Sequence, residues 1–203
     1  MDEAGEAIDR CASMQLECPG AEKIMIEEYV PMAVREFERL KRLGDRALAQ
    51  LPAENFFSVL RRGDNSVGLI LKHVSGNLIS RWTDFLTSDG EKPNRNRDTE
   101  FLILPDDSRE NLLASWEKGW AALFGALEPL GNSDLTRTVT IRGEPLSVLQ
   151  AINRQLTHYA YHVGQIVFLA KHFAGDTWNS LSIPVGRSQH FNQTPIDYVE
   201  KKA

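Results

Sequence analysis

The chain has few cysteines and no long apolar run. Its 203 residues include only two cysteines, Cys11 and Cys18, and the spacing between them suits neither a disulfide framework nor a zinc knuckle. We expect both thiols to stay reduced and incidental. No stretch of eighteen apolar residues occurs, and the N-terminal MDEAGEAIDR is acidic where a secretory signal would be basic and then apolar. These features predict a cytoplasmic protein with no membrane partner.

The sequence also lacks an excess of positive charge. Asp and Glu outnumber Lys and Arg by 28 to 23, which gives a net charge of -5, and the basic residues are scattered among acidic ones. No basic stripe is available to follow a nucleic-acid backbone, so we expect no nucleic-acid partner. A P-loop, a G-x-G-x-x-G motif and a G-x-S-x-G elbow are all absent from the sequence, which disfavours the common nucleotide-binding and serine-hydrolase classes.

Four amphipathic segments predict an all-α fold. Apolar residues recur in them at spacings of three and four, as on a helix with one buried face. Asn65 or Ser66 can cap the second helix, Pro145 opens the last and Gly175 closes it. We predict one domain over residues 24–203, an up-down four-helix bundle, preceded by a loosely held extension at 1–23. The expected helices cover 24–51, 65–86, 107–130 and 145–173.

Two shorter segments accompany these helices. The run LTRTVTIR at 135–142 alternates and is rich in Thr and branched residues, which predicts a short strand or hairpin arm before the last long helix. The C-terminal segment from residue 177 contains Pro and Gly but also large apolar side chains, so we expect an extended tail that packs over the helices. Those side chains are Trp178, Leu181, Ile183 and Phe191.

Three histidines carry the strongest chemical signal. His158 and His162 are four residues apart on the last predicted helix, so their rings share one face about 6 Å apart. A third imidazole from His73, on the second predicted helix, would complete a three-nitrogen metal site with open coordination positions. The alternative is that each is a hydrogen-bonded residue near the core with no metal. His172 is too far along the helix, by about 15 Å, to share the same ion, and His190 in the tail is a surface or supporting residue.

The neighbours of these histidines predict a lined cavity. His73 shares a polar stripe with Asn77, Ser80 and Asp84, beside an apolar stripe of the same helix. The segment HYAYH lacks the Glu with which an H-E-x-x-H protease activates water, which disfavours that class. Paired Glu-x-x-His motifs for a di-iron site are also missing from both histidine segments. The remaining alternatives are one metal ion or none.

At these segments the chain resembles the DinB/YfiT-like superfamily of metal-binding four-helix bundles, and within it a bacterial branch that is a domain of unknown function. The resemblance is carried by HVSGNLISRWTDFLTSDGEKPNRNRDTEF, HYAYHVGQIVFLAKH and WNSLSIPVGRSQHFN, which span most of residues 67–192. It implies a single divalent ion, zinc or nickel first and iron or manganese next, held by His73, His158 and His162. It also implies chemistry on low-molecular-weight thiols, because characterised relatives include bacillithiol S-transferases and mycothiol-dependent isomerases.

Residues around the implied ion are candidates for second roles. Asn77 and Gln165 can hold water or orient substrate, and Arg154 can pair with a substrate carboxylate. Tyr161 and Asp84 are weaker candidates. Each is equally consistent with a polar residue on a helix surface. The loop NRNRDTEF is either a substrate rim or a self-paired loop in which Arg95 or Arg97 bridges Asp98 and Glu100.

Three functions stay open at this point. The first is a metal-dependent thiol transferase or related hydrolase acting on a small molecule. The second is a non-catalytic bundle whose metal site has a structural, sensing or interaction role. The third is an interaction protein that uses its first helix or its tail, and pairing into a homodimer fits the resemblance as well.

Overall fold

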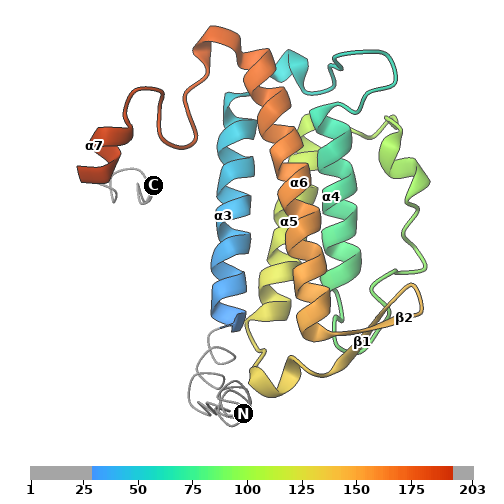
Figure 1. Ribbon diagram of the computed structural model, residues 1–203. Coiled ribbons are helices and arrows are strands. Elements are labelled where there is room, and N and C mark those ends of the chain that lie inside the picture. The colour runs from blue at the N-terminus through green and yellow to red at the C-terminus, as the bar shows by residue number, and fades with distance from the viewer. Residues whose placement is uncertain (1–28, 194–203) are drawn as a thin grey trace, which may run out of the picture.

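The computed structural model describes residues 29–193, and this part of the chain is mostly helical with one small sheet. Figure 1 shows the four long helices lying side by side. They are α3 (Tyr29–Gln50), α4 (Val67–Trp82), α5 (Arg109–Leu127) and α6 (Val148–Ala174). A two-stranded sheet joins α5 to α6, and a short helix, α7 (Ser188–Gln193), follows. The predicted extension at 1–23, with both cysteines, lies outside the described residues.

Aromatic side chains fill the space between the long helices. Phe37 of α3 lies between Trp82, Trp120 and Tyr159, with ring centroids about 6 Å apart in edge-on and tilted pairs. Helix α4 packs closely on α5 and α3 on α6, and α4 also contacts α6. At the α4–α5 contact, a Cβ on Gly119 would lie 2.8 Å from the Cβ of Leu78, so only glycine permits this approach. The core thus holds α4 against α6, the two helices that carry the histidines.

Serine side chains begin three of the helices. Ser66 accepts a hydrogen bond from the backbone N–H of Leu69 at the start of α4. Ser108 accepts one from the backbone N–H of Asn111 at the start of α5. Ser147 and Gln150 cap α6 reciprocally. This corrects the prediction that Pro145 opens the last helix: Pro145 lies in a strand, and the capping pair two residues later starts the helix.

The prediction that the second helix continues to residue 86 is also wrong. Helix α4 ends at Trp82 because Thr83 is extended and Asp84 has a φ of 49°. The third predicted helix is shorter as well, since α5 ends at Leu127 and not at residue 130. These ends leave two connections between the long helices, residues 83–108 and 128–147.

The predicted strand segment forms one arm of a hairpin. Strand β1 (Thr138–Ile141) pairs antiparallel with β2 (Glu144–Ser147), with Val139 opposite Leu146. Arg142 and Gly143 make the turn with positive φ values of 56° and 75°. The backbone N–H groups of both turn residues donate to the carboxylate of Asp89, which ties the hairpin to the 83–108 connection.

The C-terminal segment packs on the helices at its start. Arg46 of α3 donates to the carbonyl of Leu181, whose side chain is buried. Residues 182–190 are exposed, including Ile183 and Val185, whereas Phe191 is half-buried. The described part of the segment also contains the short helix α7, where extended chain is predicted. Within residues 29–193 no helix combines the length and apolar character needed to cross a membrane.

Candidate metal centre

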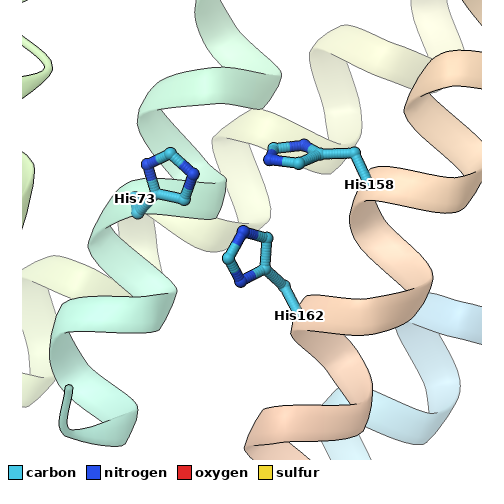
Figure 2. A group of neighbouring side chains, drawn as sticks. All are labelled: His73, His158 and His162. Atoms are coloured by element: carbon cyan, nitrogen blue, oxygen red, sulfur yellow. The ribbon is translucent and has the colours of Figure 1, made fainter. Parts of the chain in front are cut away.

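The three histidines meet between α4 and α6. His73 comes from α4 and His158 and His162 from successive turns of α6, and Figure 2 shows their rings turned toward one another. The ring centroids lie 5.5 Å apart for His73 and His158, 4.9 Å for His73 and His162, and 4.8 Å for His158 and His162. One potential ligand atom from each ring lies within 4.8 Å of the others. The three residues chosen from sequence are therefore brought together by the fold.

Two of the rings are fixed by acceptors on their outer nitrogens. Nδ1 of His73 donates to Oε2 of Glu100 over 2.7 Å, and Nδ1 of His162 donates to Oε1 of Gln165 over 2.8 Å. With the proton on Nδ1, the Nε2 atom of each ring carries the lone pair that a metal needs. For His73 the assignment follows from the ionised carboxylate, which has no proton to give, and for His162 it follows from the amide oxygen that Gln165 turns toward the ring.

Two of the ring nitrogens are buried without partners. Nε2 of His162 and Nδ1 of His158 have no hydrogen-bond partner among the described residues. An unpartnered buried polar atom costs about 1 to 3 kcal/mol of folding free energy, and a bound cation would satisfy the lone pair on Nε2 of His162. The donor set, three imidazoles with borderline-soft nitrogens, fits a divalent ion such as zinc or nickel.

The local environment also keeps two of the rings neutral. Burial, followed by the charges of His162 and His73, lowers the pKa of His158 to about 3. Burial lowers the pKa of His162 to about 4, although its hydrogen bond to Gln165 acts in the opposite direction. Neutral imidazoles at pH 7 are ready to bind a metal without first releasing a proton.

Glu100 is held in place by a buried ion pair. Arg95 donates through Nε to Oε1 over 2.7 Å and through Nη2 to Oε2 over 2.9 Å, a bidentate contact. Burial raises the pKa of Glu100, but hydrogen bonds from His73 and Arg95 outweigh it and the net shift is downward. The carboxylate is therefore ionised and restricted in orientation. Of the self-pairing predicted for this loop, the structure shows the pair of Arg95 with Glu100.

Sequence reasoning missed that Glu100 also contacts His73. The two residues are 27 positions apart, and Glu100 lies in a short 3-10 helix, η2 (Asp98–Phe101), that no periodic pattern predicts. A possible signal is Gly76, one turn after His73. A Cβ there would lie 2.5 Å from Oε1 of Glu100, so glycine leaves the space that the carboxylate occupies.

The other predicted residues have diverse surroundings. Asn77 is buried and its Oδ1 accepts a hydrogen bond from the hydroxyl of Tyr159. Arg154 pairs with Glu144 at the surface, 3.0 Å apart. Tyr161 is exposed, and its ring centroid lies 4.2 Å from that of His162. Asp84 lies beyond the end of α4, away from the histidines' polar stripe.

The remaining histidines do not join the group. His172 is exposed and its ring contacts Phe173, and His190 lies in α7. Among the described residues the metal-compatible cluster consists of His73, His158 and His162.

A polar cavity of about 290 Å³ opens at the histidines. Two of the three clustered histidines, His73 and His158, line it. Its walls come from α4, α6, the 83–108 connection and the hairpin turn. The lining residues are His73, Asn77, Arg81, Arg95, Arg97, Arg142, Arg154, Gln155, Thr157, His158 and Tyr161.

The chain was compared with known protein families, curated proteins and solved structures. A family model described as a protein of unknown function (DUF1572) matches residues 25–187, a span that holds α3 to α6 and all three clustered histidines. The chain belongs to the DUF1572 family. Searches among curated proteins and among solved structures give no match. The predicted membership of a domain of unknown function is thus confirmed, and the wider DinB-like assignment stays a prediction.

Proposed function

We propose that this DUF1572 protein is a divalent-metal-dependent enzyme of the DinB-like superfamily, with α3 to α6 as its four-helix bundle. The metal ligands would be His73, His158 and His162. The observation that supports this most directly is the convergence of three imidazoles, with potential ligand atoms within 4.8 Å of one another. Zinc or nickel is our first choice of metal, and iron or manganese suits the same nitrogens.

The surrounding residues support a reactive site. Glu100 accepts a hydrogen bond from Nδ1 of His73, and Gln165 accepts one from Nδ1 of His162. Such partners set both the orientation of a ligand ring and its basicity. Three protein ligands leave positions free for water or substrate. When bound, the divalent ion would lower the pKa of a water or thiol and so supply a nucleophile at neutral pH.

The cavity favours catalysis over a purely structural metal. Structural zinc sites are closed by four protein ligands, whereas here an accessible cavity reaches His73 and His158. Asn77 lines it, and because its Oδ1 is engaged by Tyr159, its side-chain N–H is the group left to bind water or substrate. Tyr161 forms a wall beside the rings. We propose thiol S-transfer or a related hydrolysis, with a low-molecular-weight thiol as substrate.

A panel of thiols and electrophiles tests this activity. We expect conjugation or hydrolysis by the metal-loaded protein that is lost in the His158→Ala variant. The exposed His172 provides a matched control, because His172→Ala removes a histidine from the same helix outside the cluster. If chelation lowers the melting temperature but no reaction occurs across the panel, the non-catalytic alternative replaces the enzyme proposal. The cytoplasmic location and the homodimer stay predictions.

A further inference from the structure

Guanidinium groups gather around the cavity at the histidines. Five of its lining residues are arginines, although the chain as a whole carries a net charge of -5. They come from segments far apart in the sequence, so the fold and not a basic run creates the cluster. The five are Arg81 on α4, Arg95 and Arg97 in the 83–108 connection, Arg142 in the hairpin turn and Arg154 on α6.

Two of these arginines are buried and fixed. The side chain of Arg81 pairs with Glu91 over 2.8 Å, and that of Arg95 pairs with both Glu91 and Glu100. Their side chains are only 7% and 5% exposed. Glu91 and Glu100 match the charges of these two arginines. The pair therefore fixes the wall of the cavity, and the excess positive charge comes from the remaining arginines.

The other three arginines can reach a ligand. Arg142 and Arg154 hold one glutamate each and are about half exposed, which makes these ion pairs easy to exchange. Arg97 has no carboxylate partner among the described residues, and its guanidinium lies 5.5 Å from the ring centroid of Phe101. The ion pairs in the cluster engage three glutamates, Glu91, Glu100 and Glu144, for five arginines.

Gln155 adds an unsatisfied polar group to the same wall. Its side chain is 4% exposed, lines the cavity, and has a buried amide oxygen without a hydrogen-bond partner in residues 29–193. Amide oxygen and nitrogen can be exchanged by a half-turn of the side chain, so Gln155 can present an N–H donor to the cavity. Excess positive charge and a free amide together are the groups that recognise an oxyanion.

We infer that this arginine cavity binds the carboxylate or phosphate group of a small anionic substrate and so directs the reactive end of that substrate to the histidines. Arg97 and Arg154 contact the oxyanion, while Arg81 and Arg95, held by Glu91 and Glu100, form the rigid wall behind it. The size of the cavity, about 290 Å³, suits a small molecule. The inference rests on the proposed function for the reaction at the histidines, but oxyanion binding itself needs no metal.

Calorimetric titration of the full chain tests the inference. Succinate and inorganic phosphate are the two anionic probes, and succinamide is the neutral counterpart of succinate. Each is titrated at low ionic strength into metal-loaded and metal-free protein. We expect at least one of the two anions to bind both the metal-loaded and the metal-free protein. The anion that binds more tightly identifies the recognised group as carboxylate or phosphate. Succinamide should not bind.

Arginine variants then locate the binding site. Arg97→Gln should weaken binding about fivefold or more, and adding Arg154→Gln should weaken it further, because each removes a charge-assisted hydrogen bond. The control is Arg137→Gln: Arg137 pairs with Asp134 at the surface and does not line the cavity. Affinity in Arg137→Gln should equal that of the parent.

The outcomes separate this inference from the metal proposal. Three results would overturn the arginine site while leaving metal binding intact. Anion binding could be unchanged in the Arg97→Gln/Arg154→Gln variant, it could be absent for both anions, or it could occur only with metal. A chain that binds no metal but loses anion affinity in these variants overturns the proposed function and supports the arginine site. Circular dichroism of each variant confirms that the helices are retained.

Discussion

Glu100 places its carboxylate oxygen Oε2 2.7 Å from Nδ1 of His73, although the two residues are 27 positions apart in the sequence. The contact links the 83–108 connection to the histidine cluster. Because Arg95 grips the same carboxylate from the other side, neither Glu100 nor the His73 ring can turn freely. The orientation of the His73 ring thus depends on the ion pair between Glu100 and Arg95, two residues outside the histidine cluster.

Replacing Glu100 by Gln should weaken metal binding. The amide keeps the shape but loses the negative charge that holds the His73 proton on Nδ1 and satisfies Arg95. Loss of such an outer partner reduces metal affinity by about 10- to 100-fold. Competition with a chromophoric chelator measures the change. The exposed Glu128 provides the control, and equal affinities for Glu100→Gln and Glu128→Gln would contradict the role of Glu100.

Gly76→Ala should also weaken metal binding, although the substitution leaves every histidine in place. The new Cβ would lie 2.5 Å from Oε1 of Glu100 and force that carboxylate away from His73. We expect Gly76→Ala to lower metal affinity and the melting temperature. Gly125→Ala is the matched control, because nothing lies within 4 Å of its Cβ, and alanine there should be neutral or stabilising. Unchanged metal affinity in Gly76→Ala would rule out this steric account.

The stability of metal-free protein should fall as the pH drops below about 6.5. Burial, then neighbouring histidine charges, lowers the folded-state pKa of His158 to about 3, and burial lowers that of His162 to about 4. As the pH falls, the unfolded chain therefore binds protons before the folded chain does. The contribution of the two histidines to the free energy of unfolding is complete above about pH 6.5 and is lost progressively toward about pH 3.

Thermal unfolding between pH 8 and pH 5 measures this effect. Glu100 has a lowered pKa, so it stays ionised over this range and contributes little to the slope. The His158→Gln/His162→Gln variant should show a flatter dependence of melting temperature on pH. An identical slope in the parent and the double variant would show that other groups govern the pH dependence.

Tyr159→Phe should destabilise the core beside the site. The Tyr159 hydroxyl donates to Asn77 and accepts from the indole N–H of Trp82, and all three side chains are buried. Removing the oxygen leaves both partners unsatisfied, at a cost of about 1 to 3 kcal/mol in the free energy of unfolding. Urea denaturation gives this value. Tyr161→Phe serves as the exposed control, and a loss of the same size in both variants would contradict the account.

The sequence predicted the long helices better than their ends. Periodic apolar residues indicate buried faces, and Ser66 and Gly175 mark helix ends locally. Pro145 misled because proline suits both a first helical turn and an edge strand, and only pairing with β1 decides between them. The early end of α4 depends on Asp84, whose positive φ no periodicity reveals.

The candidate site divides in the same way. His158 and His162 share a face by helical geometry alone, so their proximity follows from spacing. Their meeting with His73 depends on how α4 packs against α6, and the position of Glu100 depends on a short 3-10 helix that no periodic pattern predicts. The arginines around the cavity come from four separate segments, and local patterns do not predict contacts between them.

Metal analysis of the intact chain, combined with anomalous diffraction at the absorption edge of the metal found, tests the central claim most directly. The account predicts one divalent ion per chain, with its anomalous peak between His73, His158 and His162, and loss of that ion in His158→Ala but not in His172→Ala. A metal-replete preparation that holds no ion, a peak elsewhere, or a His158→Ala variant that binds metal as tightly as the parent would contradict it.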